Sequence, residues 1–374
     1  MRIFVNGNSL KAYTSGTPQR GLIHALCRLR PRDEFHIFLS NDTEAKVLSR
    51  YWYALEQLGN VYIHHTCASQ KKINLKKLVG IKSYQSDNHF DFYLSPGMPE
   101  YFNRRQQPSI STIADLSSLN APGTSSLKWH GNRIFKNTLK WSVNSNSQIG
   151  AISDFTLSEL SEKFPALQSR FFTLYNGIED IWLDEQFKSN ELTNSYKGQD
   201  YWIWWGFGSN RKNLHRLVEA YLSAHKQHNT LPRLLLVGKI ADELDVLKAK
   251  INSSQQIDLI PFQDALILKT LVRNSRGLLF PSLYEGFGLP IIETYAQGRP
   301  VLYGNCTSMP EIASEFGVAV DPLDIESIKA GLMAMQTFDI SQEYEQQVKK
   351  YASQFTYVNA AQQLSNRIDE LISH

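Results

Sequence analysis

The stretch FPSLYEGFGLPIIE, residues 280–293, carries the clearest structural signal in this chain. The apolar run of residues 277–280 is followed by a proline, which predicts a short buried parallel strand. Residues 290–297 are predicted to form a helix, because proline suits the first helical turn and Gly298 suits the position just past the helix end. The chain is therefore expected to run through a strand, a tight loop and a helix.

The loop between this strand and helix has the features of an anion-binding site. Backbone N–H groups at a helix start lack intrahelical partners, and the helix dipole there favours a negative charge such as a diphosphate. The residues at this position are Gly286, Phe287, Gly288 and Leu289. Glu285 and Glu293 can reach one ligand from different directions, and acceptor-only carboxylates suit the hydroxyl groups of a sugar and a ribose. The alternative is an ordinary turn with two solvated glutamates.

Glu285 and Glu293, with seven residues between them and GFG after the first, resemble the E-x7-E motif of retaining glycosyltransferases of the GT-B fold, family 4. The segments GRPV at 298–301 and MPEIA at 309–313 fit the same pattern. The resemblance implies an α/β protein with two Rossmann-like, doubly wound domains facing a central cleft. It also implies that Glu285 holds hydroxyl groups of the donor sugar, that Glu293 holds the ribose, and that the reaction needs no metal or other cofactor.

Composition narrows the possible functions. The 374 residues are enough for about two domains, and a net charge of +3 is too small for a dedicated nucleic-acid binder. The three cysteines, Cys27, Cys67 and Cys306, have no metal-binding or CxxC spacing and fit a reducing cytosol. No segment is apolar and long enough for a signal peptide or a membrane span. A cytoplasmic enzyme is therefore expected.

The order of predicted elements supports two domains in series. Each half alternates strands and helices, which predicts parallel sheets and a ligand cleft at the strand ends. The strands are predicted at 2–6, 35–39, 61–64, 92–94, 110–113, 149–152 and 171–174, then at 201–205, 234–237, 257–260 and 277–280. The polar segment 179–200 is interpreted as a linker. The expected division is an acceptor-binding domain at 1–180 and a nucleotide-sugar-binding domain at 181–350. Residues 351–374 form an amphipathic helix that, by the resemblance, crosses back to the first domain.

A second informative stretch is WWGFGSNRKNL, residues 204–214, which again leads from a strand through a loop to a helix. Cations at a helix start oppose its dipole, so Arg211 and Lys212 indicate an anionic ligand. The stretch resembles the family's RKN motif, in which the basic pair binds the donor diphosphate. Phe207 stands where many relatives carry an arginine. A solvated basic turn is the alternative, and a dinucleotide fingerprint is disfavoured because Arg211 replaces its third glycine.

Two further positions border the donor site by the same resemblance. Gly238 ends a strand next to the expected ligand. Phe262 follows another strand, where its ring could stack on a nucleoside base or pack into the core.

The first half matches the family less closely. Asp115 corresponds to an aspartate that could orient an acceptor hydroxyl, but Ala114 replaces the histidine that usually precedes it. Asp115 could equally be a capping or loop residue. Gly16 is expected near the donor phosphates, although Pro18 stands where a second glycine is common.

Two basic segments of the first half suggest contact with a membrane. Residues 71–82 contain five lysines and no acidic residue, and residues 116–153 also lack Asp and Glu. Basic amphipathic segments can lie on anionic lipid. Each segment alone could be a solvated face, but relatives often use this domain to bind an acceptor on a lipid carrier.

Together these features predict a cytoplasmic enzyme, peripheral on the inner face of the cytoplasmic membrane. It would be a retaining hexosyltransferase acting on a nucleotide sugar and a glycan acceptor, the latter linked to polyprenyl diphosphate, in bacterial surface polysaccharide synthesis. The RKN variant weakly favours GDP-mannose as donor. The alternatives are a nucleotide-sugar epimerase of the same fold and a catalytically silent partner subunit.

Overall fold

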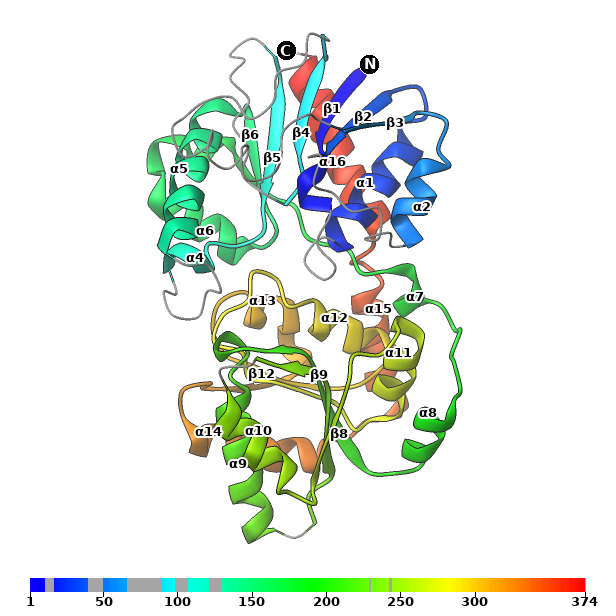
Figure 1. The fold of residues 1–374 in the computed structure, drawn as a ribbon, viewed down its shortest axis with the longest axis vertical. Coiled ribbons are helices and arrows are strands. Elements are labelled where there is room, and N and C mark those ends of the chain that lie inside the picture. Colours follow the sequence, from blue (N-terminus) through cyan, green and yellow to red (C-terminus); the bar gives the residue numbers. More distant parts are fainter. Residues whose placement is uncertain are drawn as a thin grey trace. The chain divides into compact units, whose positions relative to one another are not determined.

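The computed structural model describes residues 1–10, 17–39, 50–65, 89–97, 107–120, 129–228, 230–241 and 244–373. The described residues divide into two compact units (Figure 1). Unit 1 holds those of 1–177 together with 356–373, and unit 2 holds those of 178–355. Each unit is built on its own parallel sheet.

Unit 1 contains a seven-stranded parallel sheet in the order β3-β2-β1-β4-β5-β6-β7. The strands are β1 (Arg2–Asn6), β2 (Glu34–Leu39), β3 (Val61–His65), β4 (Phe92–Ser95), β5 (Ser109–Ile113), β6 (Gln148–Ala151) and β7 (Phe171–Thr173). All seven predicted strands of the first half are confirmed. The strand order reverses at β1, where Ile3 is paired with Phe35 on one side and Phe92 on the other.

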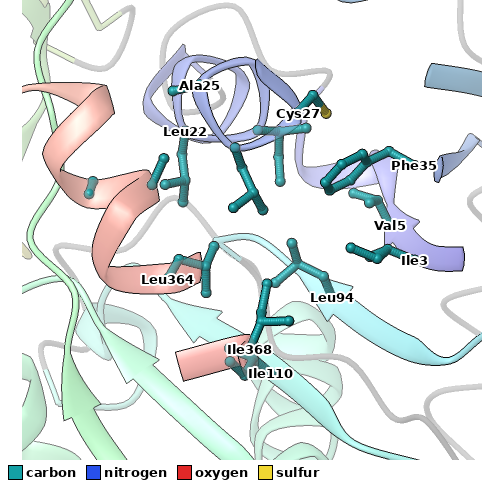
Figure 2. Close-up of a cluster of buried hydrophobic side chains, with 14 of the residues drawn as sticks. Ile3, Val5, Leu22, Ala25, Cys27, Phe35, Leu94, Ile110, Leu364 and Ile368 are labelled. Carbon is teal, nitrogen blue, oxygen red and sulfur yellow. The ribbon is translucent and has the colours of Figure 1, made fainter. Parts of the chain in front are cut away.

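The helices of unit 1 include the last helix of the chain. They are η1 (Gly7–Leu10), α1 (Thr17–Leu29), α2 (Arg50–Glu56), α4 (Ser117–Asn120), α5 (Trp129–Ser145), α6 (Asp154–Lys163), η2 (Pro165–Arg170) and α16 (Tyr357–Ile372). Helix α16 packs against α1, and both place apolar side chains over β1, β2 and β4 (Figure 2). A Cβ added at Gly21 of α1 would lie only 2.1 Å from the Tyr357 ring, so the two helices approach as closely as they do because this residue is glycine. Arg30 Nη1 also lies 2.7 Å from Asp369 Oδ1.

Unit 2 contains a six-stranded parallel sheet in the order β10-β9-β8-β11-β12-β13. The strands are β8 (Tyr201–Gly208), β9 (Arg233–Ile240), β10 (Ile257–Ile260), β11 (Leu278–Phe280), β12 (Val301–Gly304) and β13 (Val318–Val320). The helices are α7 (Asp180–Leu183), α8 (Glu191–Tyr196), η3 (Asn210–Lys212), α9 (Leu214–Gln227), α10 (Asp245–Asn252), α11 (Ala265–Asn274), α12 (Leu289–Ala296), α13 (Met309–Ala313), η4 (Ser314–Phe316), α14 (Ile325–Gln336) and α15 (Gln342–Ala352). The predicted strand, loop and helix around residues 280–293 are thus confirmed as β11 and α12.

The polar segment 179–200, predicted as a linker, is instead a folded part of unit 2. Helix α8 begins with a capping box, in which the side chains of Asn190 and Thr193 each accept the other residue's backbone N–H. The fully buried Lys269 of α11 holds the segment before α8 through Asp184, at 2.7 Å from Nζ to Oδ1. Local capping and this ion pair order a segment that lacks apolar periodicity. No helix among the described residues is both long and apolar enough to cross a membrane.

Candidate active site

The candidate site lies at the carboxyl ends of β8 and β11, which are neighbours in the sheet of unit 2. After β8 the chain makes one turn of 3-10 helix, η3, which contains Arg211 and Lys212. Asn213 then adopts a left-handed conformation with φ of 55°, and α9 begins at the next residue. The two cations therefore precede α9 and lie beside the loop that follows β11.

Glu285 joins the two cations. Its Oε2 lies 2.8 Å from Nη1 of Arg211, and its Oε1 lies 2.8 Å from Nζ of Lys212. Arg211 Nη1 also donates to the Tyr284 carbonyl at 2.6 Å, and Lys212 Nζ lies 4.5 Å from the centre of the Phe280 ring. The structure thus brings together three of the predicted site residues, one from the β11 loop and two from the β8 loop.

The charges of this cluster are strongly coupled. Burial by itself would raise the pKa of the Glu285 carboxyl, but Arg211 and Lys212 outweigh that effect and lower the pKa to about 2. Burial lowers the pKa of Lys212, and the nearby Glu285 carboxylate opposes this change. Glu285 is therefore a carboxylate at neutral pH, and it partly neutralises a cationic site.

Glu293 has the opposite character. Burial, reinforced by the charge of Glu179, raises the pKa of its carboxyl to about 8, although a hydrogen bond from Trp205 and the charge of Lys212 act the other way. At neutral pH this carboxyl is mostly protonated, so it can donate as well as accept a hydrogen bond. The surroundings of Glu293 thus disfavour its charged form, which differs from the acceptor-only carboxylate expected for both glutamates.

The loop that carries Glu285 is held by residues that the sequence did not single out. Thr307, with φ of 56°, accepts the backbone N–H of Glu285 at 3.1 Å. The buried Ser308 hydroxyl donates to the carbonyls of Glu285 at 2.9 Å and Phe287 at 3.0 Å. Both residues immediately precede the MPEIA segment. Their position next to a motif that resembles the family could have identified them in the sequence.

Asn213 ties three loops together and was also not predicted as a site residue. Its buried side-chain amide donates to the carbonyls of Pro281 at 2.9 Å and Pro322 at 2.6 Å. These carbonyls follow β11 and β13, so one side chain fixes the β8 loop against two others. The signal in the sequence was an asparagine directly after the basic pair, since asparagine tolerates the left-handed conformation.

The start of α12 is formed by the predicted glycine loop. Gly288 has φ of 102°, and no side chain caps the helix, which begins at Leu289. The Phe287 side chain is buried and meets Phe355 edge to face, with ring centres 5.9 Å apart. Phe287 can therefore face a ligand only through its backbone.

The remaining predicted residues divide between the units. A Cβ at Gly238 would lie 2.0 Å from the Gly206 carbonyl, so close approach of β9 to β8 explains this glycine. Phe262 is 54% exposed, which rules out the core-packing alternative for its ring. In unit 1, Asp115 accepts from the backbone N–H and hydroxyl of Ser117, the loop-capping role already considered. Gly16 lies outside the described residues.

Within the described ranges, no group of three or more histidine, cysteine, aspartate or glutamate side chains is arranged to hold a metal ion.

The segment that contains the candidate site also resembles known glycosyltransferases. The model of the family described as "Glycosyl transferases group 1" matches residues 186–355. The chain is 27% identical over 253 residues to the O-antigen chain mannosyltransferase B of Escherichia coli, covering 64% of each protein. It is 21% identical over 239 residues to the O-antigen chain mannosyltransferase RfbU of Salmonella typhimurium, covering 63% of each. The chain thus matches less than two thirds of the length of these relatives.

Solved structures match over nearly the whole chain. WaaG, a glycosyltransferase involved in lipopolysaccharide biosynthesis, has a TM-score of 0.69 at 15% identity and covers 98% of this chain and 99% of its own. Anabaena Alr3699/HepE in complex with UDP and glucose has a TM-score of 0.68 at 14% identity, covering 99% of both chains. These likenesses establish the fold. Residues 186–355 thus match the model of the glycosyl transferases group 1 family, and the chain has the GT-B fold.

Proposed function

We propose that this chain is a retaining glycosyltransferase that moves a hexose from a nucleoside-diphosphate sugar to a glycan acceptor. The observation that carries the proposal is the joining of Arg211, Lys212 and Glu285 at the carboxyl ends of β8 and β11. Ligands of open parallel sheets bind at this edge, and paired cations suit a diphosphate. The same cluster lies inside the segment that matches the glycosyl transferases group 1 model.

In this proposal the two cations stabilise the negative charge that develops on the diphosphate as the bond to the sugar breaks. Arg211, Lys212 and the backbone at the start of α12 do so in place of a divalent metal. Glu285 holds hydroxyl groups of the sugar, and Glu293 holds the ribose. The acceptor attacks from the face that the diphosphate leaves, and the leaving phosphate takes the acceptor proton, so the anomeric configuration is retained.

GDP-mannose is the donor that we propose. Support comes from the relatives, which include the O-antigen chain mannosyltransferases of Escherichia coli and Salmonella typhimurium. The same relatives support an acceptor in bacterial surface polysaccharide synthesis. We propose further that this acceptor is linked to a polyprenyl diphosphate on the inner face of the cytoplasmic membrane.

We also propose that unit 1 contacts anionic lipid. Helix α5 exposes Lys136 and Lys140, four residues apart and so on one face of the helix. Each cation near an anionic surface adds about 1 kcal/mol to membrane binding. The basic segment at 71–82 lies outside the described residues and adds no structural support.

The first test is thermal unfolding of the purified chain with GDP, UDP, dTDP and CDP in parallel. A nucleotide present at about 100 times its dissociation constant stabilises the protein by about 2.7 kcal/mol. We expect GDP to raise the unfolding temperature most. Transfer from GDP-mannose to a polyprenyl-diphosphate saccharide in vesicles should then yield an α-mannoside, identified by NMR. Absence of any nucleotide shift and of any transfer would overturn the proposal.

A further inference from the structure

The arrangement of Glu285 raises a question about how the donor site binds its ligand. The two cations proposed to bind a diphosphate are already engaged by one carboxylate, with each oxygen 2.8 Å from a cationic nitrogen. Two cations and one anion leave the cluster with a net charge of +1. A bound diphosphate and the Glu285 carboxylate therefore compete for the same donors.

The exposed fractions of the three side chains indicate which of them an incoming anion contacts first. Arg211 is 27% exposed, Lys212 is 14% exposed and Glu285 is 8% exposed. An anion arriving from solvent therefore meets the cations before it meets the carboxylate. Glu285 lies behind them and cannot easily leave, because Thr307 and Ser308 hold its backbone on both sides.

We propose that Glu285 is an internal counter-anion, which the donor diphosphate must displace from Arg211 and Lys212 when it binds. This inference rests on the proposed function. Once displaced, the carboxylate is nearly buried and has lost two charged partners, which is unfavourable unless new donors replace them. The hydroxyl groups of the donor hexose can supply such donors, whereas a nucleoside diphosphate lacks the hexose, and its ribose hydroxyl groups are proposed to bind Glu293 instead.

A consequence concerns product release. The intact donor supplies sugar hydroxyl groups that replace the lost hydrogen-bond donors of the Glu285 carboxylate. The nucleoside diphosphate that remains after transfer does not supply them. Glu285 then forms its ion pairs with the two cations again, which lowers the affinity of the site for the nucleoside diphosphate. The carboxylate thus makes the site prefer the donor over the spent nucleotide.

The opposing explanation is that Glu285 only orients the two cations. In that case its removal would loosen Arg211 and Lys212 and weaken the binding of any diphosphate. The two explanations predict changes of opposite sign in the affinity for a nucleoside diphosphate.

Calorimetric titration of GDP into the wild type and Glu285→Gln separates them. We expect the variant to bind GDP about tenfold more tightly, because a negative charge next to the diphosphate is removed. Transfer by the same variant should fall, since a sugar contact is lost. Equal or weaker GDP binding by a folded Glu285→Gln would overturn the inference while leaving the proposed function intact. A wild type that binds no nucleotide would instead overturn the proposed function.

Glu345→Gln is the matched control, because Glu345 also bridges two arginines of unit 2, Arg273 and Arg299. It should leave GDP affinity unchanged within about twofold, since no diphosphate site is proposed there. Should Glu285→Gln fail to fold, the wild type provides a second measurement. Its inhibition constant for GDP must then exceed the dissociation constant of a non-reacting GDP-mannose analogue, and a lower value contradicts the inference.

Discussion

Unit 2 contains two clusters in which one glutamate lies between two cationic side chains, but the backbone that carries the charges differs between them. Glu285 lies between Arg211 and Lys212, and Glu345 lies between Arg273 and Arg299, at 3.1 and 2.9 Å. Glu345 and Arg273 are on the helices α15 and α11, and Arg299 also donates to the Arg273 carbonyl at 2.8 Å. Arg299 lies between α12 and β12. In the Glu285 cluster, Arg211 and Lys212 lie on the short η3, and Glu285 lies on the loop after β11.

The backbone around the Glu285 cluster contains two non-glycine residues in left-handed conformations, Asn213 and Thr307, whereas the left-handed residue beside the Glu345 cluster is Gly298. A left-handed conformation costs free energy for a residue with a side chain, and such strain concentrates at functional sites, but glycine adopts it without that cost. The comparison teaches that an ion-pair pattern alone does not mark a site. The backbone that carries the charges, and their place at the carboxyl edge of the sheet, distinguish the two clusters.

The largest expected effect separates the clusters by activity. Lys212→Gln should lower the rate of sugar transfer by about 100-fold or more, because a charge that stabilises the leaving diphosphate is lost. Single-turnover transfer assays measure this change. Arg273→Gln should transfer at nearly the wild-type rate, and a similar loss in both variants would erase the distinction between the clusters.

The support of the Glu285 cluster can be tested through Asn213. Asn213→Ala should lower the free energy of unfolding by about 3 kcal/mol, because two carbonyls lose their donor and alanine is strained in the left-handed conformation. Asn213→Gly should recover about 1 kcal/mol, since only the strain is relieved. Denaturant unfolding measures both values. Equal stability of the two variants would show that backbone strain is not stored at this position.

A smaller effect is expected in the structural cluster. Glu345→Gln should lower the free energy of unfolding by about 1 kcal/mol, because its carboxylate is 24% exposed and such pairs are partly screened by solvent. Nucleotide-induced stabilisation should stay as in the wild type. A loss of nucleotide response would mean that this cluster also supports the donor site.

The last expected effect is a pH dependence of stability that arises from Glu293 and is measured as a slope. Its pKa of about 8 in the folded protein exceeds the usual value near 4.5, so the folded state retains a proton that the unfolded state releases. Stability from this group is therefore fully present below about pH 4.5 and declines as pH rises towards 8. Unfolding measured from pH 5 to 8 should show a shallower decline in Glu293→Gln. An unchanged slope would contradict a protonated carboxyl.

The sequence predicted most elements that surround the site, because strands ending in glycine or proline and helices starting with proline have local signals. It did not predict β12 and β13, which are only four and three residues long. Arg211, Lys212 and Glu285 were each predicted from their loops. Their joining depends on the pairing of β8 with β11 and could not be derived from local patterns.

The raised pKa of Glu293 also could not be predicted from the sequence, because it depends on tertiary contacts. Its pKa depends on Trp205 and Glu179, which are distant along the chain and approach it only in the folded unit. The bonds of Asn213 to Pro281 and Pro322 likewise link loops that follow different strands. Properties that arise from tertiary contacts can be identified only once the structure is known.

The packing of α16 on α1 has a consequence for how the chain folds during synthesis. The core of unit 1 includes the fully buried Leu364 and Ile368, which are made after all of unit 2. At a synthesis rate of about 5–20 residues per second, the sheet of unit 1 waits roughly 10 to 40 s for its final helix. Unit 2 is complete before that helix emerges. The usual order, in which the N-terminal domain matures first, is therefore reversed, and a ribosome that stalls before α16 emerges would leave unit 1 open to aggregation.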